Sequence, residues 1–190
     1  MSGSDTASEL LDAAQHLIQE RGYNAFSYKD LSGQVGIRTA SIHYHFPSKA
    51  DLGQALMERY LVDLTGALER IEAKAKTAKA RLQGFFALYG ATESQGSICL
   101  CGSLASDRET LPEPLQEAVG DYLSKSEKWI AKAISDGLAA GEFEPGAKPA
   151  DQAGALLAAL QGGLMLSRAR DGKPILQAVQ RSFFSALGAR

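Results

Sequence analysis

The sequence predicts an all-α fold with two domains, and two observations lead to that prediction. Apolar residues recur every three or four positions along most of the 190 residues, which is the spacing of one face of an α-helix. The 19 glycines and six prolines favour helices that are separated by turns. Short helices are expected over residues 1–50, and a larger helical domain is expected over residues 51–190.

The first helix is expected over residues 6–21. Its apolar stripe consists of Leu10, Leu11, Ala14, Leu17 and Ile18. Gly22 follows and can end the helix, because glycine adopts the left-handed conformation without strain. Met1–Ser4, ahead of this helix, is expected to be disordered.

The second helix begins at Ser27, whose hydroxyl can cap its first turn. Asp30 then lies at the positive end of the helix dipole, where a carboxylate is favourable. Leu31 and Val35 are four residues apart and therefore share one helical face. Gly36 comes next and is expected to end this short helix.

The third helix is expected over Arg38–His45. Pro47 ends it, because proline has no backbone N–H and biases the preceding residue away from helix. A long fourth helix is expected from Ser48 to Lys76, since Ser48 and Asp51 have the spacing of a capping box. Two short helices around a glycine turn, the later one polar, describe a helix-turn-helix that binds DNA.

The third helix carries the candidate base-reading residues. Arg38 is the expected base reader, because its guanidinium fork matches the O6 and N7 atoms of guanine. Thr39 and Ser41 can reach bases or phosphates, whereas Ala40 is not expected to read bases.

Affinity for DNA is not expected to come from a general basic surface, because the formal net charge of the chain is -2. A few placed cations, helix N-termini and neutral donors must supply it. The expected phosphate ligands are His43, Tyr44 and Lys49. The full set of candidate DNA-contacting residues is Ser27, Tyr28, Lys29, Arg38, Thr39, Ser41, His43, Tyr44, His45 and Lys49. Alternatively, His43 and His45 are ordinary surface histidines, and Ser27 is a cap with or without a DNA contact.

Three motifs resemble the DNA-binding domain of the TetR/AcrR family of bacterial repressors. They are Gly22-Tyr23, Ser27-Tyr28-Lys29-Asp30-Leu31 and Tyr44-His45-Phe46-Pro47-Ser48-Lys49, within a match from Ser8 to Leu56. The sequence departs from the family pattern at Thr39, Ala40 and His43, where the family usually has Lys, Gly and Tyr.

The resemblance implies a homodimeric repressor that binds a near-palindromic operator in double-stranded DNA. Residues 1–50 would then be the DNA-binding domain, and residues 51–190 the ligand-binding and dimerisation domain. A small, apolar organic effector in the second domain would release the operator, and the long fourth helix would couple the two events.

Further helical segments are expected at residues 82–89, 99–104, 115–140, 151–170 and 174–187, with a break at Gly90–Gly96. Aromatic and apolar residues of the larger domain are candidates for an effector pocket. They are Tyr60, Phe85, Phe86, Tyr89, Leu100, Leu104, Tyr122 and Trp129. The alternative for each of them is an ordinary place in the hydrophobic core.

The last two helices are apolar on more than one face, so they are expected to need a partner. The resemblance implies that two chains join these helices in a four-helix bundle. The expected contacts with the second chain are Leu160, Gly163, Leu164, Phe183 and Leu187.

Cys99 and Cys101 offer an alternative mode of regulation. They are too few for a disulfide framework, but a thiol near a helix N-terminus has a lowered pKa and reacts with electrophiles or oxidants. The competing interpretation is that both are small buried apolar residues. A helical interaction module without DNA binding is a further alternative.

Signatures of other functional classes are not found in the sequence. There is no G-x-S-x-G, Walker or H-E-x-x-H motif, so an enzyme is not expected, and neither a metal site nor a cofactor is expected. The chain has no apolar run long enough to span a bilayer and no leader sequence, so a cytoplasmic protein without a membrane partner is expected.

Overall fold

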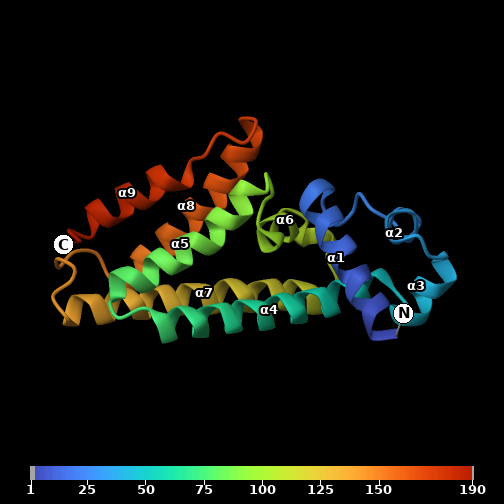
Figure 1. Cartoon of the computed structure of the whole chain (residues 1–190), viewed down its shortest axis with the longest axis horizontal. Helices are drawn as coiled ribbons and strands as arrows, with labels where there is room; N and C mark the ends of the chain where they lie inside the picture. Colours follow the sequence, from blue (N-terminus) through green and yellow to red (C-terminus); the bar gives the residue numbers. More distant parts are fainter. Residues whose placement is uncertain (1–2, 190) are drawn as a thin grey trace. The chain divides into compact units, whose positions relative to one another are not determined.

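The computed structural model describes residues 3–189, and all regular structure among them is helical (Figure 1). These residues form nine α-helices and one short 3-10 helix. The predicted all-α fold is therefore confirmed.

The described chain divides into two compact units. The first runs as far as Asp63 and also contains Leu100–Tyr122, while the second contains Leu64–Cys99 and the residues from Leu123 onward. Helices α4 (Lys49–Lys74) and α7 (Glu113–Ala139) contribute residues to both units. The unit that contains the helix-turn-helix therefore extends beyond residue 50, where the sequence suggests a boundary.

Three helices form the N-terminal part of the first unit: α1 (Gly3–Arg21), α2 (Tyr28–Val35) and α3 (Thr39–His45). Their shared core is almost inaccessible to solvent and contains Leu10, Ala14, Leu17, Ile18, Leu31, Ile42, Leu52 and Leu56. Gly3 and Ser4, which the sequence suggests are disordered, belong to α1. Met1 and Ser2 lie outside the described residues.

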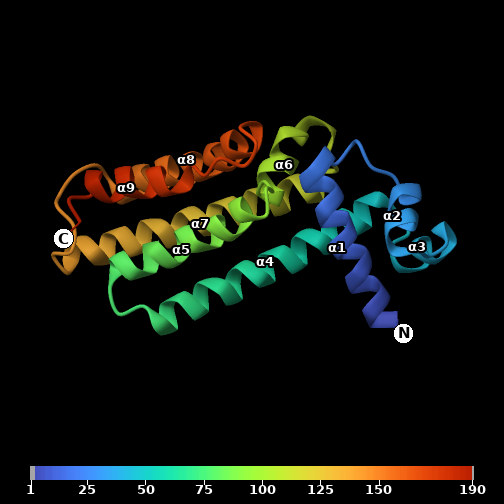
Figure 2. The same cartoon turned by 45° about the horizontal axis from the view of Figure 1, so that its top comes forward.

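Helix α6 (Leu100–Ser106) packs on α1 within the first unit (Figure 2), and the 3-10 helix (Arg108–Thr110) follows α6 along the chain. The buried Ser103 hydroxyl donates to the Ile18 carbonyl at 2.7 Å. The Asp107 carboxylate accepts the Tyr23 N–H, also at 2.7 Å. These bonds hold α6 and Asp107 against the C-terminal end of α1, and the second one satisfies the N–H of the residue that follows Gly22.

The second unit contains α5 (Ala78–Ser94), α8 (Pro149–Ala169) and α9 (Leu176–Ala186), together with parts of α4 and α7. The expected break from Gly90 is wrong, because α5 continues through Gly90 to Ser94. One glycine inside a helix costs only about 1 kcal/mol relative to alanine. The buried side chains of Phe85, Phe86 and Tyr89 outweigh that cost by fixing the helix in the core.

Helices α8 and α9 lie side by side (Figures 1 and 2), and most residues expected to contact a second chain are buried within this chain. Leu160, Leu164 and Leu187 are buried within the chain. A Cβ at Gly163 would lie 2.5 Å from the Leu176 side chain, so this glycine permits the close approach of α9. These residues therefore do not form the outer face of the helix pair.

Phe183 is the exception in that set, because it lines an open groove of about 470 Å³ along α8 and α9. The other lining residues are Ala155, Leu156, Ala159, Ala178, Val179 and Ser182. Met165 and Leu166 of α8 are 53% and 56% exposed. The outer face of the helix pair is thus made of small residues and a few large apolar ones.

Candidate nucleic-acid interface

Ser27 and Asp30 fix the start of α2. The backbone N–H and the hydroxyl of Ser27 both donate to the Asp30 carboxylate, at 2.7 Å and 2.6 Å. These hydrogen bonds from Ser27 hold the pKa of Asp30 below its ordinary value. The expected cap at Ser27 is therefore present, and its side chain remains exposed on the surface.

The turn between α2 and α3 depends on Gly36. Its φ of 76° is left-handed, and its N–H donates to the Ser32 carbonyl at 2.9 Å. The Ser32 hydroxyl donates to the Ile37 carbonyl at 2.5 Å. Arg38 then has extended backbone and is the N-cap of α3. The turn therefore places Arg38 at the beginning of the recognition helix.

Helix α3 is attached to the unit by one apolar side and by its C-terminal end. Ile42 is fully buried, and Phe46, the C-cap residue, is also buried. The Tyr28 hydroxyl lies 2.9 Å from the Phe46 carbonyl and 2.6 Å from the Ser48 carbonyl, to which it donates. Burial, with a further contribution from the charge of Asp51, raises the pKa of Tyr28 to about 12.

His43 completes this attachment. Its ring packs on the Tyr28 ring, with 4.8 Å between centroids. Its Nδ1 lies 3.0 Å from the Pro47 carbonyl oxygen, which only accepts hydrogen bonds, so Nδ1 carries the proton. Tyr28 and His43, both expected to contact DNA, thus also hold the helix-turn-helix together.

The opposite side of α3 is exposed. Arg38, Thr39, Ser41 and Tyr44 are all exposed, and Tyr44 reaches 85%. Ala40, which the sequence does not suggest as a base reader, shares this exposure. Its methyl group is suited to contact the methyl group of thymine. The residue type alone does not indicate such a role; the exposed position between Thr39 and Ser41 does.

Lys49 does not take the position expected of a phosphate ligand. Its Nζ donates to the Phe26 carbonyl at 2.6 Å and lies 4.7 Å and 4.1 Å from the ring centroids of Tyr23 and Phe26. Burial lowers the pKa of this lysine. The side chain is turned toward the protein because a carbonyl and two aromatic faces solvate the ammonium there. Lys29, by contrast, is exposed on α2.

The expected effector-pocket residues do not line one cavity. Tyr60, Leu100, Leu104 and Tyr122 belong to the first unit, where the rings of Tyr60 and Tyr122 stack with 4.9 Å between centroids. Phe85, Phe86, Tyr89 and Trp129 belong to the second unit, where the buried Phe85 ring stacks on Trp129 at 5.6 Å. Most of these residues therefore fill the core, and Phe86 lines a separate cavity.

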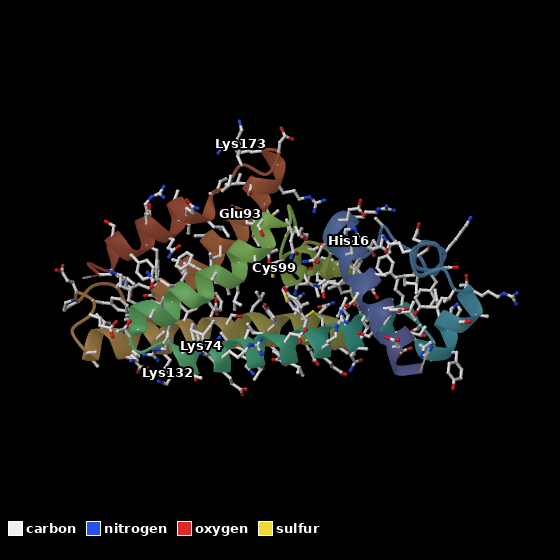
Figure 3. All side chains as sticks on the ribbon, viewed as in Figure 1. His16, Lys74, Glu93, Cys99, Lys132 and Lys173 are labelled. Atoms are coloured by element: carbon white, nitrogen blue, oxygen red, sulfur yellow. The ribbon has the colours of Figure 1, made fainter. Side chains whose placement is uncertain are left out.

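Cys99 and Cys101 are both buried, and Figure 3 labels Cys99 among the side chains. Cys99 precedes α6, whereas Cys101 is its second residue. Their burial matches the interpretation of both as small apolar residues and does not favour the thiol-sensing alternative.

No group of three or more His, Cys, Asp or Glu side chains among residues 3–189 is arranged to hold a metal ion. No helix in the same range has the length and apolar character needed to cross a membrane.

Comparison with known proteins supports the motif-based resemblance. Residues 10–56 match the family described as bacterial regulatory proteins, tetR family, and residues 67–183 match the tetracyclin repressor-like C-terminal domain. The chain is 34% identical over 80 residues to the HTH-type transcriptional repressor KstR2 of Rhodococcus jostii, covering 42% of this chain and 39% of that protein. It is 23% identical over 191 residues to the HTH-type transcriptional repressor DhaR of a Mycobacterium species, covering 98% and 94%.

A TetR transcriptional regulator from Legionella pneumophila has the same fold, with a TM-score of 0.84 and 31% sequence identity. The match covers 94% of this chain and 95% of that chain. Since both the helix-turn-helix and the C-terminal helices match, this protein belongs to the tetR family of bacterial regulatory proteins and is a helix-turn-helix DNA-binding transcriptional regulator.

Proposed function

We propose that the protein is a dimeric repressor whose two α3 helices enter successive major grooves of a near-palindromic operator. The observation that supports this most directly is the division of α3 into a buried side and an exposed polar side. Half-sites one helical turn apart would place the two helices about 34–36 Å from each other.

Within each half-site, Arg38 is the proposed base reader. It lies at the start of α3, and the N-terminal residues of a recognition helix are those that contact base edges. Thr39, Ala40 and Ser41 would contact neighbouring bases. The proposed phosphate contacts are Ser27, Lys29, Tyr44 and the exposed edges of His43 and His45, which fix position without reading sequence.

The proposed dimer uses the outer face of α8 and α9. The groove between Ala155, Ala159, Ala178 and Phe183 offers small residues against which helices of a second chain can pack closely. The exposed Leu166 lies seven residues after Ala159, on the same side of α8, and extends this apolar face. A patch of this kind on a soluble chain marks an interaction surface.

The proposed effector is a small organic molecule bound in the second unit, which favours a conformer with lower affinity for DNA. The chain has one tryptophan, Trp129, and it reports on this unit. Its Nε1 donates to Glu72 at 2.8 Å while its ring stacks on Phe85. An effector that separates this stack will change the tryptophan fluorescence.

Fluorescence anisotropy of labelled DNA tests this proposal. The full chain is added to DNA from the region flanking its own gene and, separately, to scrambled DNA at the same stated salt concentration. Saturable binding that exceeds binding to scrambled DNA is the expected result. Failure to bind either DNA at low salt would contradict the proposal and favour an interaction module without DNA binding. Addition of candidate effectors to the bound complex then tests release, with Trp129 fluorescence as an independent measure of binding.

A further inference from the structure

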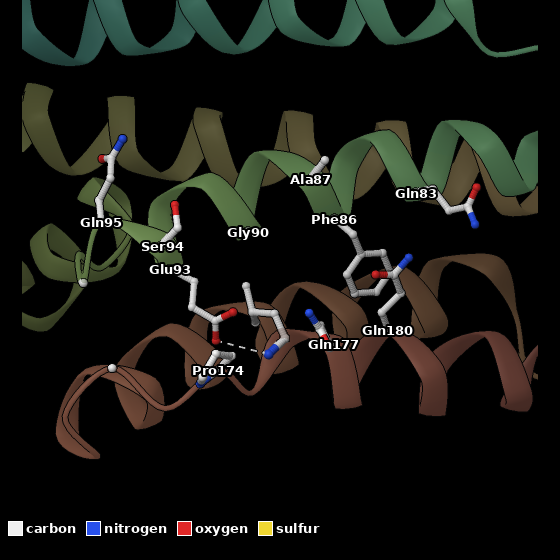
Figure 4. Close-up of a pocket in the computed structure, with 13 residues that line it drawn as sticks. Gln83, Phe86, Ala87, Gly90, Glu93, Ser94, Gln95, Pro174, Gln177 and Gln180 are labelled. Carbon is white, nitrogen blue, oxygen red and sulfur yellow. Dashed lines mark hydrogen bonds between the residues drawn. The ribbon is translucent and has the colours of Figure 1, made fainter.

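A cavity of about 610 Å³ lies in the second unit, between α5 and the beginning of α9 (Figure 4). Phe86, Gln83 and Gln180 gather at one end, and Glu93 lies toward the other. The cavity lies apart from the stack of Phe85 and Trp129, because neither of those residues lines it. It is an open pocket that is separate from that stack, and its volume is in the range of small-molecule sites.

The α5 wall of this cavity has small residues where large ones would fit. Ala87 and Gly90 line it next to the buried Phe86. A Cβ at Gly90 would meet no atom within 4 Å, and its φ is not left-handed, so neither packing nor backbone geometry requires glycine there. Glycine nevertheless weakens a helix interior. Its effect at this position is to leave the cavity open above Phe86.

The charge of the lining is one-sided. Among the described residues that line the cavity, Glu93 is the only ionisable one, and none is a lysine, arginine or histidine. Oε1 of Glu93 accepts the N–H groups of Ile175 and Leu176 at 2.7 Å and 3.2 Å, and Figure 4 marks the second of these bonds. Those bonds fix the carboxylate at the start of α9. The glutamine side chains add amide oxygens that accept hydrogen bonds.

We propose that this cavity binds a small organic cation with a flat apolar body. The body would pack against Phe86 in the space that Ala87 and Gly90 leave, and the cationic N–H groups would donate to Glu93 and to neighbouring glutamine oxygens. Hydrogen bonds between charged partners are about twice as strong as neutral ones. An anion of the same shape would face the Glu93 carboxylate with no cation in the lining to offset it.

Three probes of nearly identical shape separate charge from fit: benzamidinium, benzamide and benzoate. Each is titrated into the full-length protein without DNA, and binding is followed by calorimetry and by chemical-shift changes of the glutamine side-chain amides. We expect affinity to fall in the order benzamidinium, benzamide, benzoate, with about tenfold or more between the first and the last, as one charged hydrogen bond implies. Because no DNA is present, failure of the proposed operator binding leaves this result unaffected.

Two variants locate the binding. Gly90→Leu fills the cavity and is expected to abolish benzamidinium binding while keeping the fold. Gly120→Leu, at another helical glycine whose Cβ would meet open space, is the matched control and should bind normally. Glu93→Gln keeps an oxygen to cap α9 and should remove the preference for benzamidinium over benzamide. The proposal is overturned if the unchanged protein does not bind benzamidinium, if benzoate binds equally well, or if Gly90→Leu retains binding.

Discussion

The Lys49→Met variant separates the two roles open to this lysine, an internal contact and a phosphate ligand. Methionine keeps most of the alkyl stem, which packs on apolar surface, but removes the ammonium. In the structure that ammonium donates to the Phe26 carbonyl and lies over the rings of Tyr23 and Phe26. We therefore expect the substitution to lower the stability of the fold and to leave the number of phosphate contacts unchanged.

The size of the effect follows from those contacts. A hydrogen bond from a charged donor contributes about 1.5–3 kcal/mol. A cation–π contact at a partly exposed site adds about 0.5–1 kcal/mol. Burial of the ammonium, which lowers the pKa of Lys49, offsets part of this gain. A net loss of about 2 kcal/mol corresponds to a fall in Tm of about 4–8 °C in a protein of this size.

Thermal unfolding measures the first expectation, and the salt dependence of operator binding measures the second. Each phosphate contact contributes about 0.9 to the slope of log K against log salt concentration. Lys49→Met should keep the slope of the unchanged protein, whereas Lys29→Met, at an exposed lysine on α2, should reduce the slope and keep the Tm. A reduced slope with an unchanged Tm in Lys49→Met would refute the structural reasoning.

Three further predictions concern other parts of the molecule. Arg38→Ala should remove about 1–3 kcal/mol of discrimination at one base pair of each half-site, measured by competition with single-base operator variants, and unchanged discrimination would assign base reading elsewhere. Ala159→Glu places a charge in the α8–α9 groove and should give a monomer in sedimentation velocity, so a persistent dimer would move the interface to another face. Hydrogen bonds from Lys132 and Arg81 hold the pKa of Asp136 below its ordinary value. The contribution of the Asp136 carboxylate to stability is therefore present above about pH 4 and is lost as the pH falls through the folded-state pKa. Asp136→Asn should therefore lower the Tm at pH 7 by more than at pH 3, and an equal loss at both would contradict this assignment.

The elements with strong local signals could be predicted from the sequence. Ser48 and Asp51 form the expected capping box, with the Ser48 N–H and hydroxyl donating to the carboxylate at 2.9 Å and 2.7 Å. Gly36 ends α2 in the left-handed conformation, as expected. Both features involve residues a few positions apart, so the chain encodes them locally.

Which face of an apolar helix is turned outward could not be predicted in the same way. The apolar character of Leu160, Gly163 and Leu164 predicts a contact with a second chain, but all three are buried within this chain, and Gly163 lies against Leu176 of α9. On a helix that is apolar on several faces, periodicity does not distinguish an internal contact from an external one. The small size of Ala155 and Ala159 was the better signal of the outer face.

The orientation of the site side chains depends on partners far apart in the sequence. Lys49 reaches the carbonyl of Phe26, 23 residues away, and Tyr28 reaches that of Ser48, 20 residues away. A motif can identify these residue types and their spacing. It does not show whether a lysine or a tyrosine within it is directed toward the protein or toward a ligand, because that depends on how the helices pack.

The two sides of α3 can change independently. Ile42, Phe46, Tyr28 and His43 attach the helix to its unit, and the exposed residues from Arg38 to Ser41 take part in none of the side-chain contacts that attach it. Duplicated copies of such a gene can therefore acquire new operators through substitutions at a few exposed positions, without compensating changes in the core. For the same reason, a library randomised at residues 38–41, with Ile42 held fixed, should yield folded proteins at high frequency and allow operator preference to be selected directly.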